Sequence, residues 1–377
     1  MKNAAMLSLL VLAAGPSWSI TLAENGATAY DIVISRDQAS PSEKWAAEEL
    51  AQFLNQITGA AFPVVTDDRV ERSHHIFVGD SSLLRKTVPS LDLRSLGREG
   101  YVILTTGPHL VLAGGRQRGS MYAVYGLLED VIGCRWFTPT VSRIPKRPTL
   151  ALPPLRIRYV PPLEYREPQW YVVFDGTWNA RNRMNGTCSS LKPEQGDKIH
   201  YKGFVHTFYA LVPPSKFFAQ HPEYFALVDG QRRAENAQLC LTNPDVLRIA
   251  TDSVRRWLRE AREQGLPDDV IVSVSQNDCW GWCQCPKCTE LAEREGSQSG
   301  PILHFVNAIA DAIRKEFPNA AIDTLAYSYS RKPPKHVRPR PNVIVRLCSI
   351  ECCFSHPLAT CPVNASFMDD LREWSKI

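Results

Sequence analysis

The segment Val270-Ile-Val-Ser-Val-Ser-Gln-Asn-Asp278 decides the fold that we predict for this chain. It begins with apolar, β-branched residues, which predict a buried strand, and it ends in amide and carboxyl side chains. Helical periodicity lies on both sides of it, over Asp245–Gln264 and Pro301–Phe317, and a helix breaker follows each of these stretches, Gly265 or Pro318. Strands that alternate with helices are typical of parallel β/α units.

The same alternation extends over residues 169–377. We count about six strands there, where a closed barrel of β/α units needs about eight. The expected fold of this region is therefore an incomplete (β/α)8 TIM-type barrel, truncated at its C-terminus, and we expect its last strands to be missing from the sequence. An open sheet is the alternative. The expected strands are Trp170–Phe174, Gly203–Phe208, Tyr224–Val228, Val270–Ser275, Ala321–Tyr327 and Val343–Leu347.

A smaller α+β domain is expected before the barrel, over residues 24–145. Its first helix opens with Ser40-Pro41-Ser42-Glu43, where Ser40 can accept a hydrogen bond from a free helix N–H while Glu43 reaches back, and Gly59 ends it. Seven prolines between residues 145 and 168 interrupt helices and strand ladders, which predicts a linker over 146–168. The other expected elements are strands at Tyr30–Ser35, Phe62–Val65, Ile76–Gly79, Tyr101–Thr105 and Leu110–Gly114, and a helix at Ser120–Ile132.

The glycine-rich stretch Gly114-Gly-Arg-Gln-Arg-Gly119 lies at the junction of an expected strand and helix. Backbone N–H groups at the start of a helix attract anions, so a phosphate site is one interpretation. The stretch lacks the Lys-Ser/Thr ending and the spacing of a dinucleotide site, and a tight turn is the interpretation that we favour.

The composition excludes some classes of function. The net charge of the 377 residues is +4, with Lys and Arg scattered among acids, so no basic surface for nucleic acid is expected. No segment after the N-terminus has the roughly 18 uninterrupted apolar residues of a membrane helix. Met1-Lys2 and the apolar run that follows are typical of a signal peptide, which we place at residues 1–23, and predict a secreted or periplasmic protein. A buried N-terminal element is the alternative.

Two strand ends carry the residues that we predict to be catalytic. Asp278 follows the strand Val270–Ser275, and Glu351 follows the strand Val343–Leu347. Reactive groups in barrels lie at the C-terminal ends of strands, and glycoside hydrolysis commonly needs two carboxyls. We favour Glu351 as the proton donor, because Ile350 and Phe354 would surround it with apolar groups and raise its pKa. The alternative for each acid is an ordinary loop carboxylate that caps a helix or pairs with an arginine.

Further polar and aromatic residues near strand ends are candidates for sugar binding. An aromatic ring can cover the apolar face of a pyranose, and amide, imidazole and phenol groups can bind its hydroxyls. Packing in the core or at its rim is the alternative for each aromatic residue. The candidates are Asn277, Trp280, Trp282, His206, Tyr209, Tyr327 and His356.

The chain has eleven cysteines, more than is usual for a cytosolic enzyme. Cys279, Cys283, Cys285 and Cys288 have the ligand type and spacing of a zinc knot, which would pin a loop and perform no chemistry. Disulfides that brace the loop are the alternative that we favour, so no cofactor is expected. Cys353 and its neighbour Cys352 stand near His356, but closeness in sequence does not establish a nucleophile and base, and we do not predict a cysteine hydrolase.

The first domain resembles a known family. The stretches Gly97-Arg-Glu-Gly-Tyr-Val-Ile103, Leu112–Gly115, Arg118-Gly119, Tyr122–Tyr125 and Gly133-Cys-Arg-Trp-Phe-Thr-Pro139 are similar to the α-glucuronidase-type N-terminal domain. That domain also accompanies several hexosaminidase-like barrels.

The second region resembles a large bacterial family of barrels long labelled as a domain of unknown function. The resemblance rests on Pro222–Phe225, Gln238–Pro244, Ser273–Asp278, Cys283–Cys288 and Ile350-Glu-Cys-Cys-Phe-Ser-His-Pro357. Characterised relatives in that family are endo-β-N-acetylglucosaminidases. The resemblance implies a glycoside hydrolase for an N-acetylated sugar, in which the acetamido group of the substrate can act as the nucleophile. Carried onto this sequence, it implies that Asp278 and Glu351 orient that group and donate the proton, with the roles left open.

The function expected from the sequence is therefore that of a retaining glycosidase whose partner is a glycan with β-linked N-acetylhexosamine. A carbohydrate-binding protein without turnover, or an inactive fragment, is the alternative, because the expected barrel is incomplete. A zinc-dependent hydrolase centred on the cysteine loop is a third hypothesis.

Overall fold

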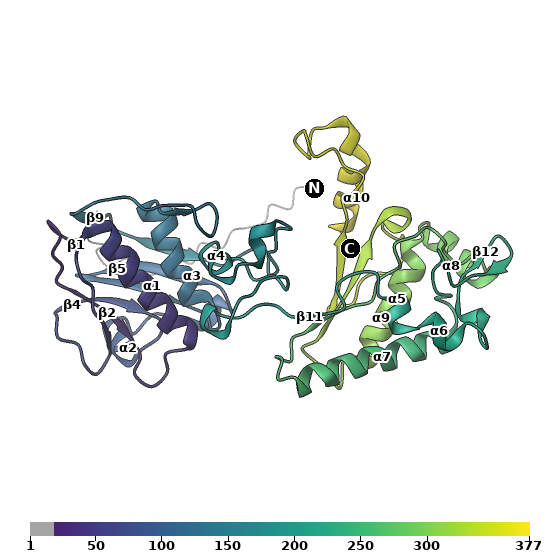
Figure 1. Cartoon of the computed structure of the whole chain (residues 1–377), viewed down its shortest axis with the longest axis horizontal. Coiled ribbons are helices and arrows are strands. Elements are labelled where there is room, and N and C mark those ends of the chain that lie inside the picture. Colours follow the sequence, from purple (N-terminus) through teal and green to yellow (C-terminus); the bar gives the residue numbers. More distant parts are fainter. Residues whose placement is uncertain (1–18) are drawn as a thin grey trace. The chain divides into compact units, whose positions relative to one another are not determined.

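The computed structural model of the chain describes residues 19–377, and these form two compact units that meet in sequence between Lys198 and Ile199 (Figure 1). Most of the expected signal peptide lies outside the described residues. Its last residues, Ile20–Ala23, form strand β1 and pair with β9 (Leu150–Leu152). The last four residues of the expected signal peptide therefore form an element of the fold.

The first unit is built on a six-stranded mixed sheet. The strand order is β10-β5-β6-β4-β2-β3; the four strands from β6 to β3 are parallel, and β5 and β10 are antiparallel to their neighbours. The five strands that we expected in this domain are all present, and each bound lies within two residues of the expected one. The bounds are β2 Tyr30–Ile34, β3 Val64–Thr66, β4 His74–Val78, β5 Tyr101–Thr106, β6 His109–Gly114 and β10 Arg156–Tyr159.

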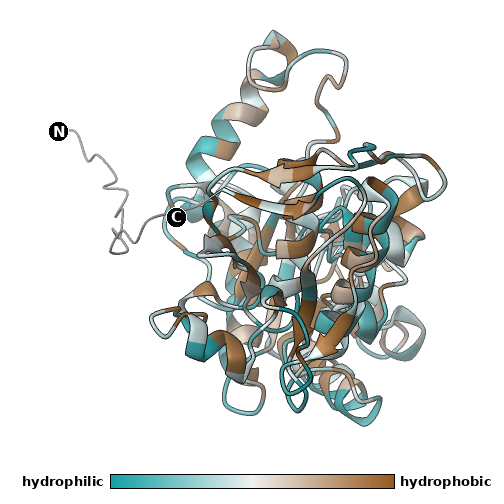
Figure 2. Cartoon of the chain, turned by 90° about the vertical axis from the view of Figure 1, so that its left-hand side faces the viewer, coloured by the Kyte–Doolittle hydropathy of each residue, from teal (hydrophilic) through white to brown (hydrophobic). Residues whose placement is uncertain are grey.

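Helices cover both faces of this sheet. Alternate strand residues such as Ile32 and Ile76 face α1 (Pro41–Thr58) and α3 (Gly119–Gly126), which run side by side across the strands in Figure 1. The residues between them, such as Val33 and Phe77, face the other way and pack with the shorter helix α2 (Ser82–Thr87). In Figure 2 many loops are hydrophilic teal, whereas hydrophobic brown gathers on strands and helices. A sheet buried on both faces explains the nearly continuous apolar runs of its strands.

The start of α1 has the predicted capping box. The Ser40 hydroxyl accepts a hydrogen bond from the backbone N–H of Glu43 at 3.2 Å, and the Glu43 carboxylate accepts one from the backbone N–H of Ser40 at 2.8 Å. Gly59 ends the helix with a φ of 81°, a left-handed conformation that glycine adopts without strain. Both ends of α1 were therefore predictable from local sequence.

The glycine-rich stretch before α3 is a tight turn packed against neighbouring backbone. The Gly115 N–H donates to the carbonyl of Gly100 and the Arg118 N–H to that of Arg98. A Cβ atom on Gly115 would lie 1.5 Å from the carbonyl oxygen of Gly97. These N–H groups are used within the fold, as the turn interpretation predicts.

The proline-rich segment 146–168 is not the linker that we expected. It contributes β9, which pairs with β1, and β10, which pairs with β5, so it belongs to the first unit. Because β10 is an edge strand and β9 belongs to a two-stranded ribbon, neighbouring prolines need not supply ladder hydrogen bonds there. The remaining short elements of the unit are the 3-10 helix Arg94–Leu96, the π-helix Leu127–Ile132, β7 Arg135–Trp136, β8 Ser142–Arg143, the 3-10 helix Tyr171–Phe174, α4 Gly176–Arg181 and the 3-10 helix Pro193–Gln195.

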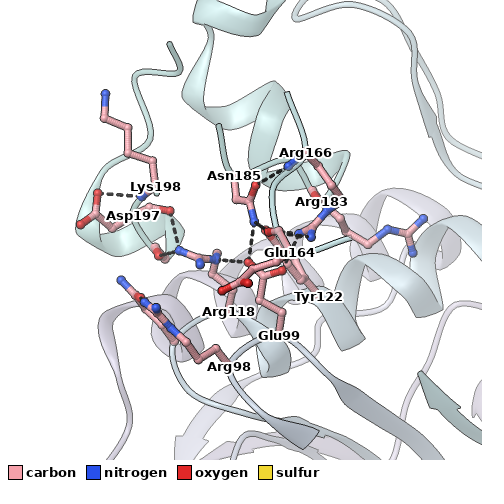
Figure 3. A network of polar contacts seen from close by, with 12 residues as sticks. Arg98, Glu99, Arg118, Tyr122, Glu164, Arg166, Arg183, Asn185, Asp197 and Lys198 are labelled. Atoms are coloured by element: carbon pink, nitrogen blue, oxygen red, sulfur yellow. Dashed lines mark hydrogen bonds and ion pairs between the residues drawn. The ribbon is translucent and has the colours of Figure 1, made fainter. Parts of the chain in front are cut away.

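A buried ion cluster ties residues 160–198 to the strands and helices of the first unit (Figure 3). Glu99 accepts hydrogen bonds from Arg118 at 2.6 Å, Arg166 at 2.7 Å and Asn185 at 2.8 Å. Arg118 is only 2% exposed and also donates to the backbone carbonyl of Gly196 at 2.9 Å. Charges taken out of water need this degree of hydrogen bonding, since an unpaired buried charge is strongly destabilising.

The second unit is built on a parallel sheet of four strands in the order β11-β14-β15-β16. Residues such as Val272, Ile322 and Val343 pack against α7 (Pro244–Glu263) and α9 (Ser299–Ile313) in one hydrophobic core. The strands are β11 Tyr201–Lys202, β14 Ile271–Ser273, β15 Ala321–Ala326 and β16 Val343–Leu347; the other elements are α5 Phe208–Leu211, α6 Pro214–Phe217, β12 Leu227–Val228, β13 Gln231–Arg232, α8 Pro286–Glu295 and α10 Ala365–Trp374, with 3-10 turns at Pro222–Tyr224, Ser328–Ser330 and Pro362–Asn364.

Three of the six strands expected for the barrel are wrong or displaced. Residues 171–174 form a 3-10 helix in the first unit, and residues 227–228 form a small antiparallel hairpin with β13. The third, expected at Gly203–Phe208, is replaced by the two-residue strand β11, because Gly203 and His206 have positive φ values of 61° and 56° and cannot continue a strand. Within residues 19–377 the strands and helices of the second unit follow one another along the chain, and the four-stranded sheet is open. These residues do not form a closed barrel. In the same residues no helix is long and apolar enough to cross a membrane.

The ion cluster gives a test of what holds the first unit together. We expect Arg118→Met to destabilise this unit by about 3 kcal/mol, because Glu99 would lose one buried partner and two backbone carbonyls would lose their donor. Urea unfolding followed by amide hydrogen exchange of α3 measures the change. The matched control is Arg36→Met, which removes an exposed pair with Asp68 and should cost less than about 1 kcal/mol. Equal effects of the two substitutions would contradict the prediction.

Candidate functional site

Four of the predicted site residues follow the four parallel strands of the second unit. His206 follows β11, Asp278 follows β14, Tyr327 follows β15 directly and Glu351 follows β16. Parallel neighbours end at the same edge of a sheet, so the loops that carry these residues leave from one edge. This is the edge where β/α folds place their reactive groups.

The Tyr327 hydroxyl binds one of the two predicted catalytic acids. It donates a hydrogen bond to the Asp278 carboxylate at 3.0 Å. That bond raises the pKa of Tyr327, burial raises it further, and the negative charge of Glu351 adds a smaller contribution in the same direction. Asp278 therefore contacts this phenol, whereas Glu351 contacts Arg331.

His206 lies beside this phenol. Its ring centroid is 5.8 Å from that of Tyr327. The His206 Nδ1 atom lies 2.8 Å from the backbone carbonyl of Gln276. A carbonyl can only accept, so Nδ1 carries a proton and, in the neutral ring, Nε2 is free to accept one.

Glu351 lies in more polar surroundings than we expected. Its side chain is 45% exposed and it accepts a hydrogen bond from Arg331 at 3.3 Å. Arg331 in turn pairs with Asp370 of α10 at 2.6 Å. Ile350 and Phe354 are 61% and 76% exposed, so they do not enclose the carboxyl, and the apolar setting that we used to favour Glu351 as the acid is wrong.

Asn277 holds the loop in place rather than presenting its amide to a ligand. Its Nδ2 atom donates to the carbonyl of Ala237 at 2.9 Å, and its Oδ1 atom accepts from the backbone N–H of Tyr209 at 3.4 Å. Gln238, which we did not predict, is 2% exposed and donates to the backbone carbonyls of Asn277 and Cys279 at 3.0 and 2.8 Å. These amides fix the backbone that carries Asp278.

The other aromatic and imidazole groups that we predicted for sugar binding lie in different surroundings. Trp280 and Trp282 form a cluster with Tyr329, with ring centroids 5.3–6.3 Å apart, and Trp280 is 65% exposed. Tyr209 packs against Phe225 at 6.0 Å, which is the packing alternative that we named. The Nδ1 atom of His356 lies 3.1 Å from the Cys353 thiol, and a role of His356 in sugar binding stays a prediction.

A buried acid and a partly buried arginine occupy the sheet face opposite α7 and α9. Asp323 is fully buried and pairs with Arg346 at 3.2 Å, and Ser273 donates to it at 3.2 Å. Arg346 also stacks over the ring of Phe204 at 4.6 Å. Burial raises the pKa of Asp323 to about 6 despite the neighbouring guanidinium. A single acid within the apolar strand 321–326 was the available signal for this residue, and we did not use it.

The cysteine cluster has a different membership from the one we predicted. Cys240, and not Cys279, joins Cys283, Cys285 and Cys288, and all four thiols are buried within 4.8 Å of one another. Cys279 is instead contacted by the side-chain amide of Gln238, at 3.3 Å.

Asp323 predicts a pH dependence of stability. Folding raises its pKa from its ordinary value near 4 to about 6, so its contribution to stability is complete below pH 4 and is lost as the pH rises through 6. We expect the stability of the wild type relative to Asp323→Asn to fall between pH 4 and 7 by on the order of 2 kcal/mol. Urea unfolding at several pH values measures this difference. The exposed Asp311, changed to Asn, is the control, and an Asp323→Asn difference that stays level or grows with pH would contradict the prediction.

The solved structures that are similar to this chain include three glycosidases. A family GH115 4-O-methyl-α-glucuronidase with specificity for decorated arabinogalactans has a TM-score of 0.44 and 13% identity over 83% of this chain and 43% of its own. A variant of the Streptomyces plicatus β-hexosaminidase in complex with GlcNAc has a TM-score of 0.43 and 12% identity, over 88% of this chain and 66% of its own. The GH20 exo-β-N-acetylglucosaminidase from Vibrio harveyi has a TM-score of 0.43 and 13% identity, over 88% of this chain and 55% of its own. The chain thus spans less than two thirds of the length of each.

Two family models match the sequence, and no curated protein does. Residues 21–127 match the model described as Glycosyl hydrolase family 67 N-terminus, in agreement with the α-glucuronidase-type resemblance of the first domain. Residues 136–377 match the model described as Domain of unknown function (DUF4838). Because this second match covers more than half of the chain, the protein belongs to the DUF4838 family.

Proposed function

We propose that this chain is a glycoside hydrolase of glycans that contain β-linked N-acetylhexosamine. The observation that carries the proposal is the pair of carboxylates, Asp278 and Glu351, on loops that leave the same edge of one parallel sheet after β14 and β16, with Asp278 hydrogen-bonded to Tyr327. The exposed Trp280 beside Trp282 offers a flat apolar surface for a pyranose ring. The resemblance to endo-β-N-acetylglucosaminidases suggests the class of sugar.

The contacts suggest different roles for the two acids. Asp278 accepts a hydrogen bond from Tyr327, an arrangement that holds the carboxylate in one orientation. We assign it to orient the acetamido group, whose oxygen attacks the anomeric carbon as the glycosidic bond breaks. Glu351 is accessible to solvent and is assigned to protonate the leaving oxygen, then to take a proton from the water that opens the cyclic intermediate.

Backbone strain at the same edge supports a functional role for it. His206 and Ser328, at the ends of β11 and β15, have positive φ values of 56° and 52°. A residue other than glycine in this region costs of order 1 kcal/mol or more, and such residues gather at active sites. Ser328 directly follows Tyr327, so the backbone conformation of Ser328 helps to set the position of the Tyr327 side chain at the end of β15.

Two substitutions test the proposal and separate the roles. We expect Asp278→Asn and Glu351→Gln each to lower kcat by about 100-fold or more on glycan substrates. An aryl β-N-acetylglucosaminide with a dinitrophenolate leaving group needs no proton, so Glu351→Gln should recover most of its activity there, whereas Asp278→Asn should not. Release of reducing sugar and of dinitrophenolate measures both rates.

The control is Asp311→Asn, an exposed acid of the same unit that pairs with Arg340, and it should leave both rates unchanged. Full turnover by the Asp278→Asn and Glu351→Gln variants would remove both acids from the mechanism and end the proposal.

A carbohydrate-binding protein without turnover is the second candidate. The 65% exposure of Trp280 favours it, because a flat exposed aromatic platform binds sugar without enclosing it. Calorimetric binding of N-glycans and product release, measured on the same preparation, separate the two candidates. Binding that Trp280→Ala abolishes, with no product formed by the wild type, would establish the binder and exclude the hydrolase.

A further inference from the structure

We propose that Cys240, Cys283, Cys285 and Cys288 bind one zinc ion that braces the loop carrying Asp278. The cysteine cluster formed by these four residues includes Cys283, at the end of the loop that follows Asp278, and is not used by the chemistry above. The inference stands on the geometry of the cluster and does not require the chain to be a glycosidase.

The spacing of the sulfur atoms fits a tetrahedral metal. The Sγ atom of Cys240 is 3.7 Å from that of Cys285 and 4.0 Å from that of Cys288, and all four Sγ atoms lie within 4.8 Å of one another. Four thiolates about 2.3 Å from a central zinc ion stand about 3.8 Å apart. A disulfide needs sulfur atoms about 2.05 Å apart and would join the cysteines in two pairs, whereas Cys240 is nearly equidistant from two partners.

The chain around the cluster is arranged as in structural zinc sites. Cys285 lies immediately before α8 and Cys288 in its first turn, where the free N–H groups of the helix favour negative sulfur. The backbone N–H of Leu227 donates to the Cys283 sulfur at 3.4 Å, and the guanidinium of Arg232 lies 3.8 Å from it. The Thr242 hydroxyl is 3.2 Å from the Cys288 sulfur. These donors would offset the net negative charge that four thiolates keep around a divalent ion.

The cluster is too small to be held by hydrophobic burial. Its buried members are the four cysteines with only Ala226 and Ala237, while the partly buried Leu227 and Val228 pack against them, and it is separate from the main core of the unit. The cysteines are 3–7% exposed. A metal would supply folding free energy that these few apolar side chains cannot.

The cluster joins two segments that carry the candidate site. The loop 277–283 carries Asp278 and ends at Cys283. It contacts the segment 237–240 through a β-bridge between Ala237 and Gly281 and through hydrogen bonds from the Gln238 side-chain amide. With four protein ligands the ion would have no open position for water or substrate, so its role is structural. The zinc-dependent hydrolase considered from the sequence is therefore not supported by this arrangement.

Metal analysis of the full chain, purified without chelators, tests the proposal. We expect one zinc per chain by inductively coupled plasma mass spectrometry, and release of that zinc when a mercurial reagent blocks four thiols. Cys240→Ser should lower the zinc content at least fivefold, and Cys279→Ser, which changes the neighbouring cysteine outside the cluster, should keep one zinc per chain. Cobalt in place of zinc should give the visible bands of a tetrahedral thiolate site.

Other results would overturn the assignment. Peptide mapping without reductant that finds Cys240 in a disulfide, bound iron in place of zinc, or loss of zinc from Cys279→Ser with retention in Cys240→Ser would each do so. If Cys240→Ser does not fold, zinc release and the cobalt spectrum of the wild type still decide the question. None of these measurements depends on glycosidase activity, so the two proposals fail separately.

Discussion

The parallel pairing of β11, β14, β15 and β16 is the constraint on which the second unit depends. Parallel neighbours require long crossovers; α7 and α9 lie in two of the three crossovers here and bury the apolar face of the sheet. The same pairing makes every strand end at one edge. Asp278 and Glu351, which are distant in sequence, consequently lie on loops that leave the same edge, and Tyr327, which follows the strand between theirs, binds Asp278.

Polar contacts within the second unit also support that edge. On the sheet face away from the helices, the buried Asp323 pairs with the partly buried Arg346. The amides of Asn277 and Gln238 hold the backbone before Asp278, and Cys283 of the cysteine cluster ends the loop that follows it. Asp278 is thus exposed, while Gln238, which holds its loop, is buried.

Buried polar contacts define the first unit as well. Glu99 draws Arg118, Arg166 and Asn185 together and so fastens residues beyond the proline-rich segment to the sheet (Figure 3). This explains why the unit continues to Lys198, well past the boundary that prolines predicted. Proline marks where a helix or ladder cannot continue, but it carries no information on which partner a segment will find.

Local sequence by itself determined five strands of the six-stranded sheet in the first unit, the caps of α1 and the position of the acids after β14 and β16, because capping, periodicity and strand ends are set by residues a few positions apart. Only the tertiary structure decided that Cys240 and not Cys279 completes the cysteine cluster, that Arg331 pairs with Glu351, and that Asp323 meets Arg346. Each of these contacts joins segments on different elements of the fold. Their partners are chosen by the packing of whole strands and helices, which no local pattern records.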